Sequence, residues 1–406
     1  MRAHNFKLVT EAVPFLDGPA PDEINVPLNG HKAVVKKGDL VRAGALLAEH
    51  PEAGRGDKHA PFDGEVTKAT AQAITVTRKN LDAAAAPAAP APEGEEGKAP
   101  AEAPKPHEAV KKDLSRLEGD ELAAALKSLG VGTRGLPPKD TSIVINALPP
   151  EPGILWNGEL LANYAKAIEA GIDVLKRLLK PIRVSAVLPE GSNANFGADV
   201  QHHQAKAAYP NSMDELVIKA ATGRENPEGT FAVSLHRVWR MGLVALSGQP
   251  MQHTVMTVQD KNYLVIPGTS LRELLSHAGI AVADGDYVSI GGLMRGKAVA
   301  DLDQGVPPCA IGLFHVPASR YAKVRENPCI NCGACVQFCP AHLMANVIGR
   351  NAEFQNYEEC KNLSVKACME CGLCGYYCIA RRPMLQYMRE AKEYIVLEEN
   401  TLQMQP

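Results

Sequence analysis

The chain has 406 residues, of which 45% are hydrophobic, and a formal net charge of −3. This length allows two or more hydrophobic cores, since a single core seldom grows beyond about 250–300 residues. The near-neutral charge supplies no strong field for nucleic acid or acidic lipid, and the 5% aromatic content argues against base-stacking surfaces.

The first thirteen residues contain no apolar run of the signal-peptide type. No stretch reaches the roughly 20 apolar residues that cross a bilayer. We therefore expect a soluble, cytoplasmic protein, which can still bind peripherally to a membrane partner.

Residues 1–81 are predicted to form a β domain, because short apolar runs such as Ile74–Thr77 alternate with Gly and Asp turn residues. Residues 82–112 are predicted to be a linker. Within it, residues 83–106 are only Ala, Pro, Glu, Gly and Lys, which offer nothing to bury against the entropy of ordering.

Residues 113–245 are predicted to be an α/β domain, because helical and strand patterns alternate. The expected helices are Leu114–Leu129 and Leu160–Leu179, and the expected strands are Ser142–Ala147 and Arg183–Leu188.

Residues 246–310 are predicted to be a small β-rich unit with one helix, which Ser270 and Glu273 begin as a capping box. Residues 320–395 carry most of the cysteines among short helices. The closing helix, Pro383–Ile395, has four apolar residues on one face, which are Met384, Met388, Ala391 and Ile395. The predicted fold class is multidomain α+β.

The ten cysteines begin only at Cys309, and nine of them lie within 329–378, which favours local metal ligation over disulfides. Two copies of one motif, Cys-x2-Cys-x2-Cys-x3-Cys, account for eight of them. The first copy is Cys329, Cys332, Cys335 and Cys339, and the second is Cys368, Cys371, Cys374 and Cys378.

Three cysteines at this spacing surround one 4Fe-4S cluster, and the fourth reaches the other cluster of a two-cluster protein. We expect one cluster on Cys329, Cys332, Cys335 and Cys378, and the other on Cys368, Cys371, Cys374 and Cys339. Zinc knuckles are the alternative, but zinc ligands follow different spacings. Clusters held only by cysteine leave no open iron for a substrate, which favours electron relay. Cys309 and Cys360 are interpreted as small buried residues.

The cluster region resembles the C subunit of the Rnf electron-transport complex, a membrane-bound ferredoxin oxidoreductase. The resemblance runs from Cys329-Ile330-Asn331-Cys332-Gly333 through Cys368–Gly372 into Pro383–Arg389, with a glycine turn, Gly291–Gly296, before the cysteines. The A subunit of the sodium-pumping NADH–quinone reductase is related but lacks the cysteine-rich end.

The resemblance extends over nearly the whole chain except the linker. Lys36–Val41 and Ala60–Gly64 resemble the family's barrel-sandwich domain, and Pro267–Leu274 resembles its β-grasp domain. It therefore implies a barrel-sandwich domain at 1–81, a complex I flavoprotein-like domain at 113–245, a β-grasp domain at 246–310 and a ferredoxin-like domain at 320–395.

The family's middle domain is similar to the NADH- and FMN-binding subunit of complex I, whose glycine loop closes on phosphate. Here the loop has Gly130, Gly132 and Gly135, but Thr133 and Leu136 replace a glycine and an aromatic residue. A second marker follows the next strand and keeps Asn146 and Glu151. Either these five residues still bind FMN and NADH, or the domain is a scaffold. We favour the scaffold.

The resemblance implies a peripheral electron-relay subunit of an Rnf-type complex at the cytoplasmic face of the membrane. Its partners would be the other subunits and a ferredoxin, cytochrome or quinone-linked protein. The alternatives are an NADH:FMN dehydrogenase subunit of the same type of complex, a quinone- or cytochrome-linked module without NADH binding, and a non-redox assembly scaffold.

Overall fold

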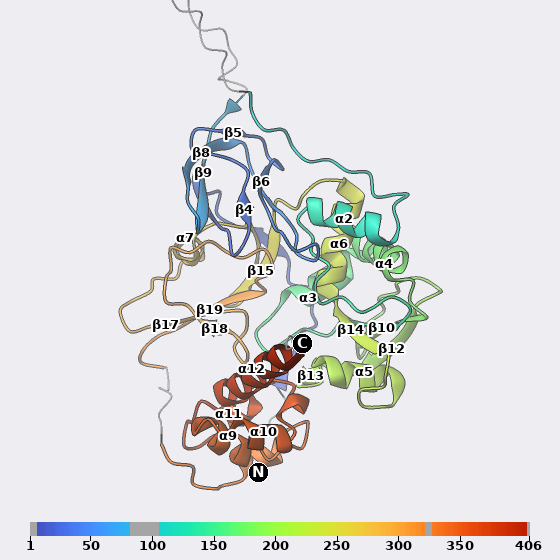
Figure 1. The fold of residues 1–406 in the computed structure, drawn as a ribbon, viewed down its shortest axis with the longest axis vertical. Helices are drawn as coiled ribbons and strands as arrows, with labels where there is room; N and C mark the ends of the chain where they lie inside the picture. The colour runs from blue at the N-terminus through green and yellow to red at the C-terminus, as the bar shows by residue number, and fades with distance from the viewer. Residues whose placement is uncertain (1–5, 82–104, 321–326, 404–406) are drawn as a thin grey trace, which may run out of the picture.

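The computed structural model describes residues 6–81, 105–320 and 327–403, with side chains described as far as residue 398. Within these ranges the chain forms a mixed α/β, multidomain fold (Figure 1). Most of the predicted linker, residues 82–104, and residues 321–326 of the predicted cysteine region lie outside the described residues.

Two small antiparallel sheets enclose the N-terminal core, with strand orders β3-β9-β8-β5 and β4-β6-β7. Strand β3 alternates exposed and buried residues, which places Ile24 and Val26 inside. The strands are β3 Glu23–Pro27, β4 Lys32–Ala33, β5 Leu40–Val41, β6 Leu46–Glu49, β7 Lys58–His59, β8 Gly64–Ala69 and β9 Ala73–Arg78.

A parallel sheet of order β12-β11-β10-β14 organises the next unit. Strands β10 and β11 are almost entirely buried, as parallel strands covered on both faces are. The elements are α2 Gly119–Ser128, β10 Ser142–Asn146, α3 Trp156–Asn163, α4 Ala165–Leu179, β11 Arg183–Pro189, β12 Gln201–Ala205, β13 Ala208–Tyr209, α5 Asp214–Thr222, β14 Thr230–Ser234 and α6 Leu235–Ser247.

A six-stranded sheet of order β18-β17-β19-β15-β16-β2 follows. Its edge strand β2, Phe15–Asp17, comes from the N-terminal segment and pairs in parallel with β16. The other elements are β15 Thr254–Val258, β16 Lys261–Val265, α7 Leu271–His277, β17 Tyr287–Ile290, β18 Lys297–Ala298 and β19 Gly312–Val316. The N-terminal segment therefore ties this sheet to the start of the chain.

The cysteine-rich unit is helical and lies at the end of the molecule opposite the two N-terminal sheets (Figure 1). Its elements are α8 Ala334–Gln337, α9 Ala345–Glu353, α10 Tyr357–Asn362, a 3-10 turn Val365–Ala367, α11 Leu373–Tyr376 and α12 Met384–Gln403. Strand β1, Phe6–Lys7, pairs with β13 near this unit. Leu8 and Tyr209 then pack with Cys371 and Leu373.

Several predicted elements are confirmed. The predicted strand at Ser142 is β10, Ser270 caps α7 by accepting a hydrogen bond from the Glu273 amide, and the four apolar residues of the closing helix are buried. The prediction of one helix over Leu160–Leu179 is wrong, because Tyr164 interrupts it with φ −120° and ψ 28°. The ring of Tyr164 packs against Phe15 and Trp239, contacts that the local pattern does not encode.

Helices α4 and α6 cross with their backbones in close approach. A Cβ at Gly242 would overlap the carbonyl oxygen of Ala167, and one at Gly171 would overlap that of Val238. The crossing holds α6, whose residues line the cavity described below, at a fixed distance from the sheet.

We predict that Gly242→Ala destabilises the protein, because overpacking of a well-packed contact costs about 1–3 kcal/mol. The thermal unfolding midpoint, followed by circular dichroism, should fall by about 3–10 °C. Leu246→Ala is the control, because Leu246 is 62% exposed on the same helix. An unchanged midpoint for Gly242→Ala would contradict the close crossing.

Candidate iron–sulfur centres and a basic cavity

The two cysteine motifs adopt matching backbone conformations. Asn331 and Gly333 in the first motif, and Glu370 and Gly372 in the second, have positive φ between 54° and 77°. Each glycine then precedes a four-residue helix, α8 or α11. The rings of Phe338 and Tyr377, each one residue before the last cysteine of its motif, stack at 3.8 Å. The two halves of the unit are thus related by an internal pseudo-symmetry.

The structure brings the eight motif cysteines together in two groups, and each group takes its fourth member from the other motif. Cys335 lies in the electrostatic environment of Cys329, Cys332 and Cys378. Cys374 lies in that of Cys368, Cys371 and Cys339. We call these group one and group two. The four thiols of group two also line one apolar cavity with Leu343, Leu385 and Met388.

Burial makes free thiolates unfavourable in these groups. Burial, reinforced by Cys368 and Cys339, raises the pKa of Cys371 to about 11. Burial likewise raises the pKa of Cys335, Cys368 and Cys374, and a neighbouring thiol contributes to each rise. Four thiolates can share such a space only with a compensating positive charge, which iron would supply.

The donor sets fit cubane clusters better than single ions. Among the described residues, no three His, Cys, Asp or Glu side chains converge as closely as one metal ion requires. Four thiols around a shared apolar space are the donor set of a 4Fe-4S cluster. The amides of Leu343 and Arg382 lie 3.4 Å from Cys339 Sγ and Cys378 Sγ, where they donate to sulfur and would tune a cluster's potential.

The two groups differ in exposure. Cys332 of group one is exposed, and Ile330 and Ile379, which follow the group-one residues Cys329 and Cys378 in the sequence, are 62% and 63% exposed. Cys371 of group two is 8% exposed, and its carbonyl oxygen accepts a hydrogen bond of 2.6 Å from the Tyr209 hydroxyl. Group one therefore faces solvent, and group two faces the body of the protein.

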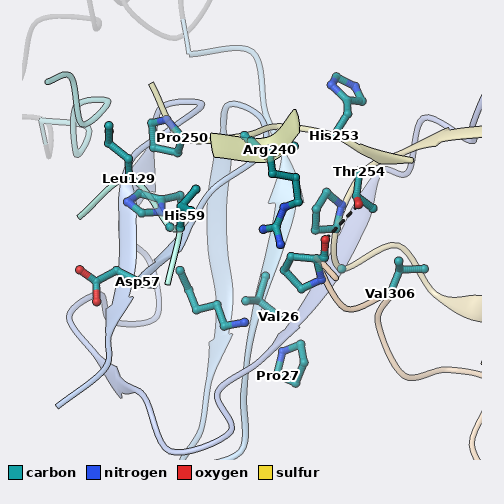
Figure 2. Close-up of a pocket in the computed structure, with 17 residues that line it drawn as sticks. Val26, Pro27, Asp57, His59, Leu129, Arg240, Pro250, His253, Thr254 and Val306 are labelled. Carbon is teal, nitrogen blue, oxygen red and sulfur yellow. Dashed lines mark hydrogen bonds between the residues drawn. The ribbon is translucent and has the colours of Figure 1, made fainter. Parts of the chain in front are cut away.

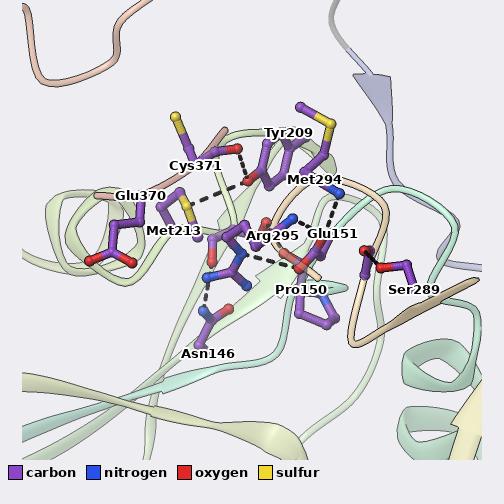
Figure 3. A network of polar contacts seen from close by, with 12 residues as sticks. Asn146, Pro150, Glu151, Tyr209, Met213, Ser289, Met294, Arg295, Glu370 and Cys371 are labelled. Atoms are coloured by element: carbon purple, nitrogen blue, oxygen red, sulfur yellow. Dashed lines mark hydrogen bonds and ion pairs between the residues drawn. The ribbon is translucent and has the colours of Figure 1, made fainter. Parts of the chain in front are cut away.

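A polar network joins group two to the rest of the molecule (Figure 3). The carboxylate of Glu151, 2% exposed, accepts hydrogen bonds from the amides of Met294 and Arg295 and from Arg295 Nε. Arg389 donates to the Arg295 carbonyl oxygen and to Glu370, between two group-two cysteines. Three units thus meet in one chain of charge-assisted contacts.

The structure separates the residues predicted to bind FMN. The side chain of Asn146 donates to the Ser212 carbonyl oxygen and to Asp214, and Glu151 is committed to the turn at residues 294–295. Neither lines the cavity beside Gly130 and Gly132.

The glycine loop packs directly against the segment before β7. The Arg134 amide donates to the Gly54 carbonyl oxygen at 2.7 Å. A Cβ at Gly132 would lie 2.7 Å from that same oxygen, and one at Gly56 would overlap the Gly130 carbonyl group. Gly135 lies beside the guanidinium of Arg237. The space beside this part of the glycine loop is therefore filled by the backbone of residues 54–56.

A basic cavity of about 520 Å³ lies beside this contact. Its cationic lining consists of Arg55, Lys58, Arg134, Arg237 and Arg240. Among the described residues that line it, the groups that can carry negative charge are Asp57 and Cys309. An adjoining pocket shares Arg240, whose side chain extends between the N-terminal strands and β15 (Figure 2). The sequence did not predict this cavity, and the helix α6 that carries Arg237 and Arg240, three residues apart, was not predicted either.

The two cysteines outside the motifs, Cys309 and Cys360, differ in burial. Cys360 is fully buried, which confirms the interpretation as a small core residue. The same interpretation of Cys309 is wrong, because Cys309 is exposed and lies 2.8 Å from Arg240 Nη1. Arg240, which is distant from Cys309 in the sequence, contacts this loop at the cavity.

Comparison with known proteins identifies the cysteine region and similar chains. Residues 322–379 match the model of a 4Fe-4S dicluster domain. The chain is 25% identical to the C subunit of the ion-translocating oxidoreductase complex of Rhodobacter capsulatus, over 80% of this chain and 69% of that protein. It is 26% identical to the C subunit of the proton-translocating ferredoxin:NAD(+) oxidoreductase complex of Clostridium ljungdahlii, over 88% of this chain and 85% of that protein.

A solved NAD+-reducing NiFe hydrogenase in the air-oxidised state aligns with a TM-score of 0.37 and 15% identity, over 56% of this chain and 48% of that one.

Within the described ranges, none of the helices combines the length and apolarity needed to span a membrane.

We predict that Glu151→Gln lowers the thermal unfolding midpoint without altering flavin content. A glutamine amide cannot accept every hydrogen bond that the Glu151 carboxylate accepts from buried donors, and an unsatisfied buried donor costs about 1–3 kcal/mol of stability. Differential scanning calorimetry of the cluster-loaded protein measures this. Glu169→Gln, at an exposed position, is the control. An unchanged midpoint together with loss of bound flavin would instead support a cofactor role for Glu151.

Proposed function

We propose, from the homology of this chain to the C subunits of ion-translocating oxidoreductase complexes, that it is the peripheral iron–sulfur subunit of such a complex. It would relay single electrons between a soluble or membrane-attached partner and the membrane subunits. The observation that carries the proposal is the convergence of eight cysteines in two groups, each completed by the other motif.

In this proposal group one and group two each hold one 4Fe-4S cluster. A bound cluster supplies reversible one-electron chemistry. The protein excludes water from group two with Leu343, Leu385 and Met388, and donates amide hydrogen bonds to the sulfurs of both groups. Because cysteine occupies every ligand position, the chain's part is transfer of electrons rather than binding of a substrate to iron.

The difference in exposure between the two groups suggests which of them exchanges electrons with an external partner. The exposed side of group one, with Ile330 and Ile379, is suited to contact a redox partner. Group two faces the polar network and the α/β unit. The partner at group one would be a membrane subunit or a ferredoxin, cytochrome or quinone-linked protein. This subunit would lie peripherally at the cytoplasmic face of the membrane.

We assign the units by the same homology. The two antiparallel sheets would be a barrel-sandwich domain, the parallel sheet a complex I flavoprotein-like domain, the region around α7 a β-grasp domain, and the C-terminal helices a ferredoxin-like domain. The corresponding ranges are 1–81, 113–245, 246–310 and 320–395, with the linker at 82–112.

We favour a scaffold role for the middle domain over FMN and NADH binding. Backbone from residues 54–57 packs on the glycine loop, and the side chains of Asn146 and Glu151 bond to other parts of the protein. An NADH:FMN dehydrogenase subunit remains the second candidate, favoured by the NAD(+) in the name of the Clostridium ljungdahlii relative.

We predict that purified protein with its clusters intact contains about eight irons per chain, the content of two 4Fe-4S clusters, and no flavin. Iron assay and flavin fluorescence after acid release measure both. NADH should not bleach the visible cluster absorbance, whereas dithionite should. Stoichiometric FMN with bleaching by NADH would favour the dehydrogenase.

We predict that replacing the fourth cysteine of one motif removes the cluster that the first three cysteines of the other motif bind. Cys339→Ala should remove the same electron paramagnetic resonance signal as Cys368→Ala, and Cys378→Ala the same signal as Cys329→Ala, because a cubane lacking one thiolate is lost or altered. Cys360→Ala, a buried cysteine outside the motifs, is the control. Loss of the signal of its own motif by Cys339→Ala would contradict the crossed arrangement.

A further inference from the structure

Cys309 lies in a loop between β18 and β19 and lines the basic cavity. Its thiol is exposed and lies 2.8 Å from Arg240 Nη1, which donates to the sulfur. It belongs to neither cysteine group, so the proposed clusters would leave it free to react.

Three of the five cations that line the cavity have no carboxylate partner among the described residues. Arg55 and Arg134 both pair with Glu52, and Asp57 is committed to Lys127 and the His50 amide. In the described ranges, Lys58, Arg237 and Arg240 form no ion pair with a carboxylate. Lys58 and Arg237 both lie in the electrostatic environment of Cys309. The cavity therefore carries an uncompensated positive charge next to a thiol.

Two buried polar atoms in the cavity wall have no hydrogen-bond partner among the described residues. His236 is 7% exposed, its ring lies against Trp156 and Trp239, and its Nε2 makes no hydrogen bond. Arg240 Nε is likewise buried without a partner. Buried polar groups normally find a partner, so this wall is suited to a polar, negatively charged group that enters from solvent.

We propose that Cys309 is a modification site that forms mixed disulfides with anionic low-molecular-weight disulfides. The Cys309 thiolate attacks one sulfur of the disulfide, a new sulfur–sulfur bond forms, and the other half leaves as a thiolate. The Cys309 sulfur is oxidised and the departing sulfur is reduced, so no other oxidant is needed. The cations attract the reagent's carboxylates and give the site its selectivity for negative charge.

The test uses the cluster-loaded full chain and two aromatic disulfides, the dianionic 5,5′-dithiobis(2-nitrobenzoate) and the neutral 4,4′-dithiodipyridine. Each rate is divided by the rate of the same reagent with a small neutral thiol. The normalised rate at Cys309 should be about tenfold or more higher for the dianion and should fall as salt increases. Mass spectrometry should find one adduct, on Cys309, and Cys309→Ser should abolish it.

Arg240→Gln should reduce the preference for the dianion about fivefold or more, as expected for loss of a nearby cation. Arg183→Gln, an exposed arginine at the start of β11, is the matched control and should leave the preference unchanged. Retention of the visible cluster absorbance checks that each variant is folded. Equal normalised rates for the two reagents, or an adduct on another cysteine, would overturn the proposal.

Discussion

The buried carboxylate of Glu151 is the contact on which the relative positions of the units depend. A buried charge is tolerated only when hydrogen bonds and an opposite charge replace its water. Glu151 obtains both from one turn, through the amides of residues 294 and 295 and the Arg295 guanidinium. The same turn is held by Arg389 of α12, and so the cysteine-rich helices are oriented through this carboxylate.

The residues that resemble a nucleotide marker in the sequence make their hydrogen bonds within the protein. In sequence, Glu151 and Asn146 stand at the positions of a nucleotide marker. In the fold, each is used within the protein, and residues 54–57 cover the glycine loop. The same chemistry, a carboxylate that accepts backbone amides, serves assembly here.

Local patterns predicted the local features well. The strand at Ser142, the cap at Ser270 and the buried face of α12 follow from periodicity and short-range hydrogen bonding. The break at Tyr164, the entry of β2 into the six-stranded sheet and the exposure of Cys309 depend on residues about 70 or more positions away, which no local pattern encodes. The cysteine motifs could be predicted because the geometry of a 4Fe-4S cluster fixes the spacing of its ligands in the sequence. The thiols that lie near one another are those of the predicted ligand sets, whose binding of clusters stays a prediction. The cavity was not predicted because its lining comes from several units.

The contact between Gly56 and the glycine loop has a geometric consequence for the cavity beside it. The segment before β7 can approach the glycine loop this closely because neither Gly56 nor Gly132 has a Cβ. One methyl group at either position would force the two backbones apart and widen the basic cavity that they border. The absence of a Cβ at Gly56 and Gly132 therefore limits the width of the cavity that Cys309 lines.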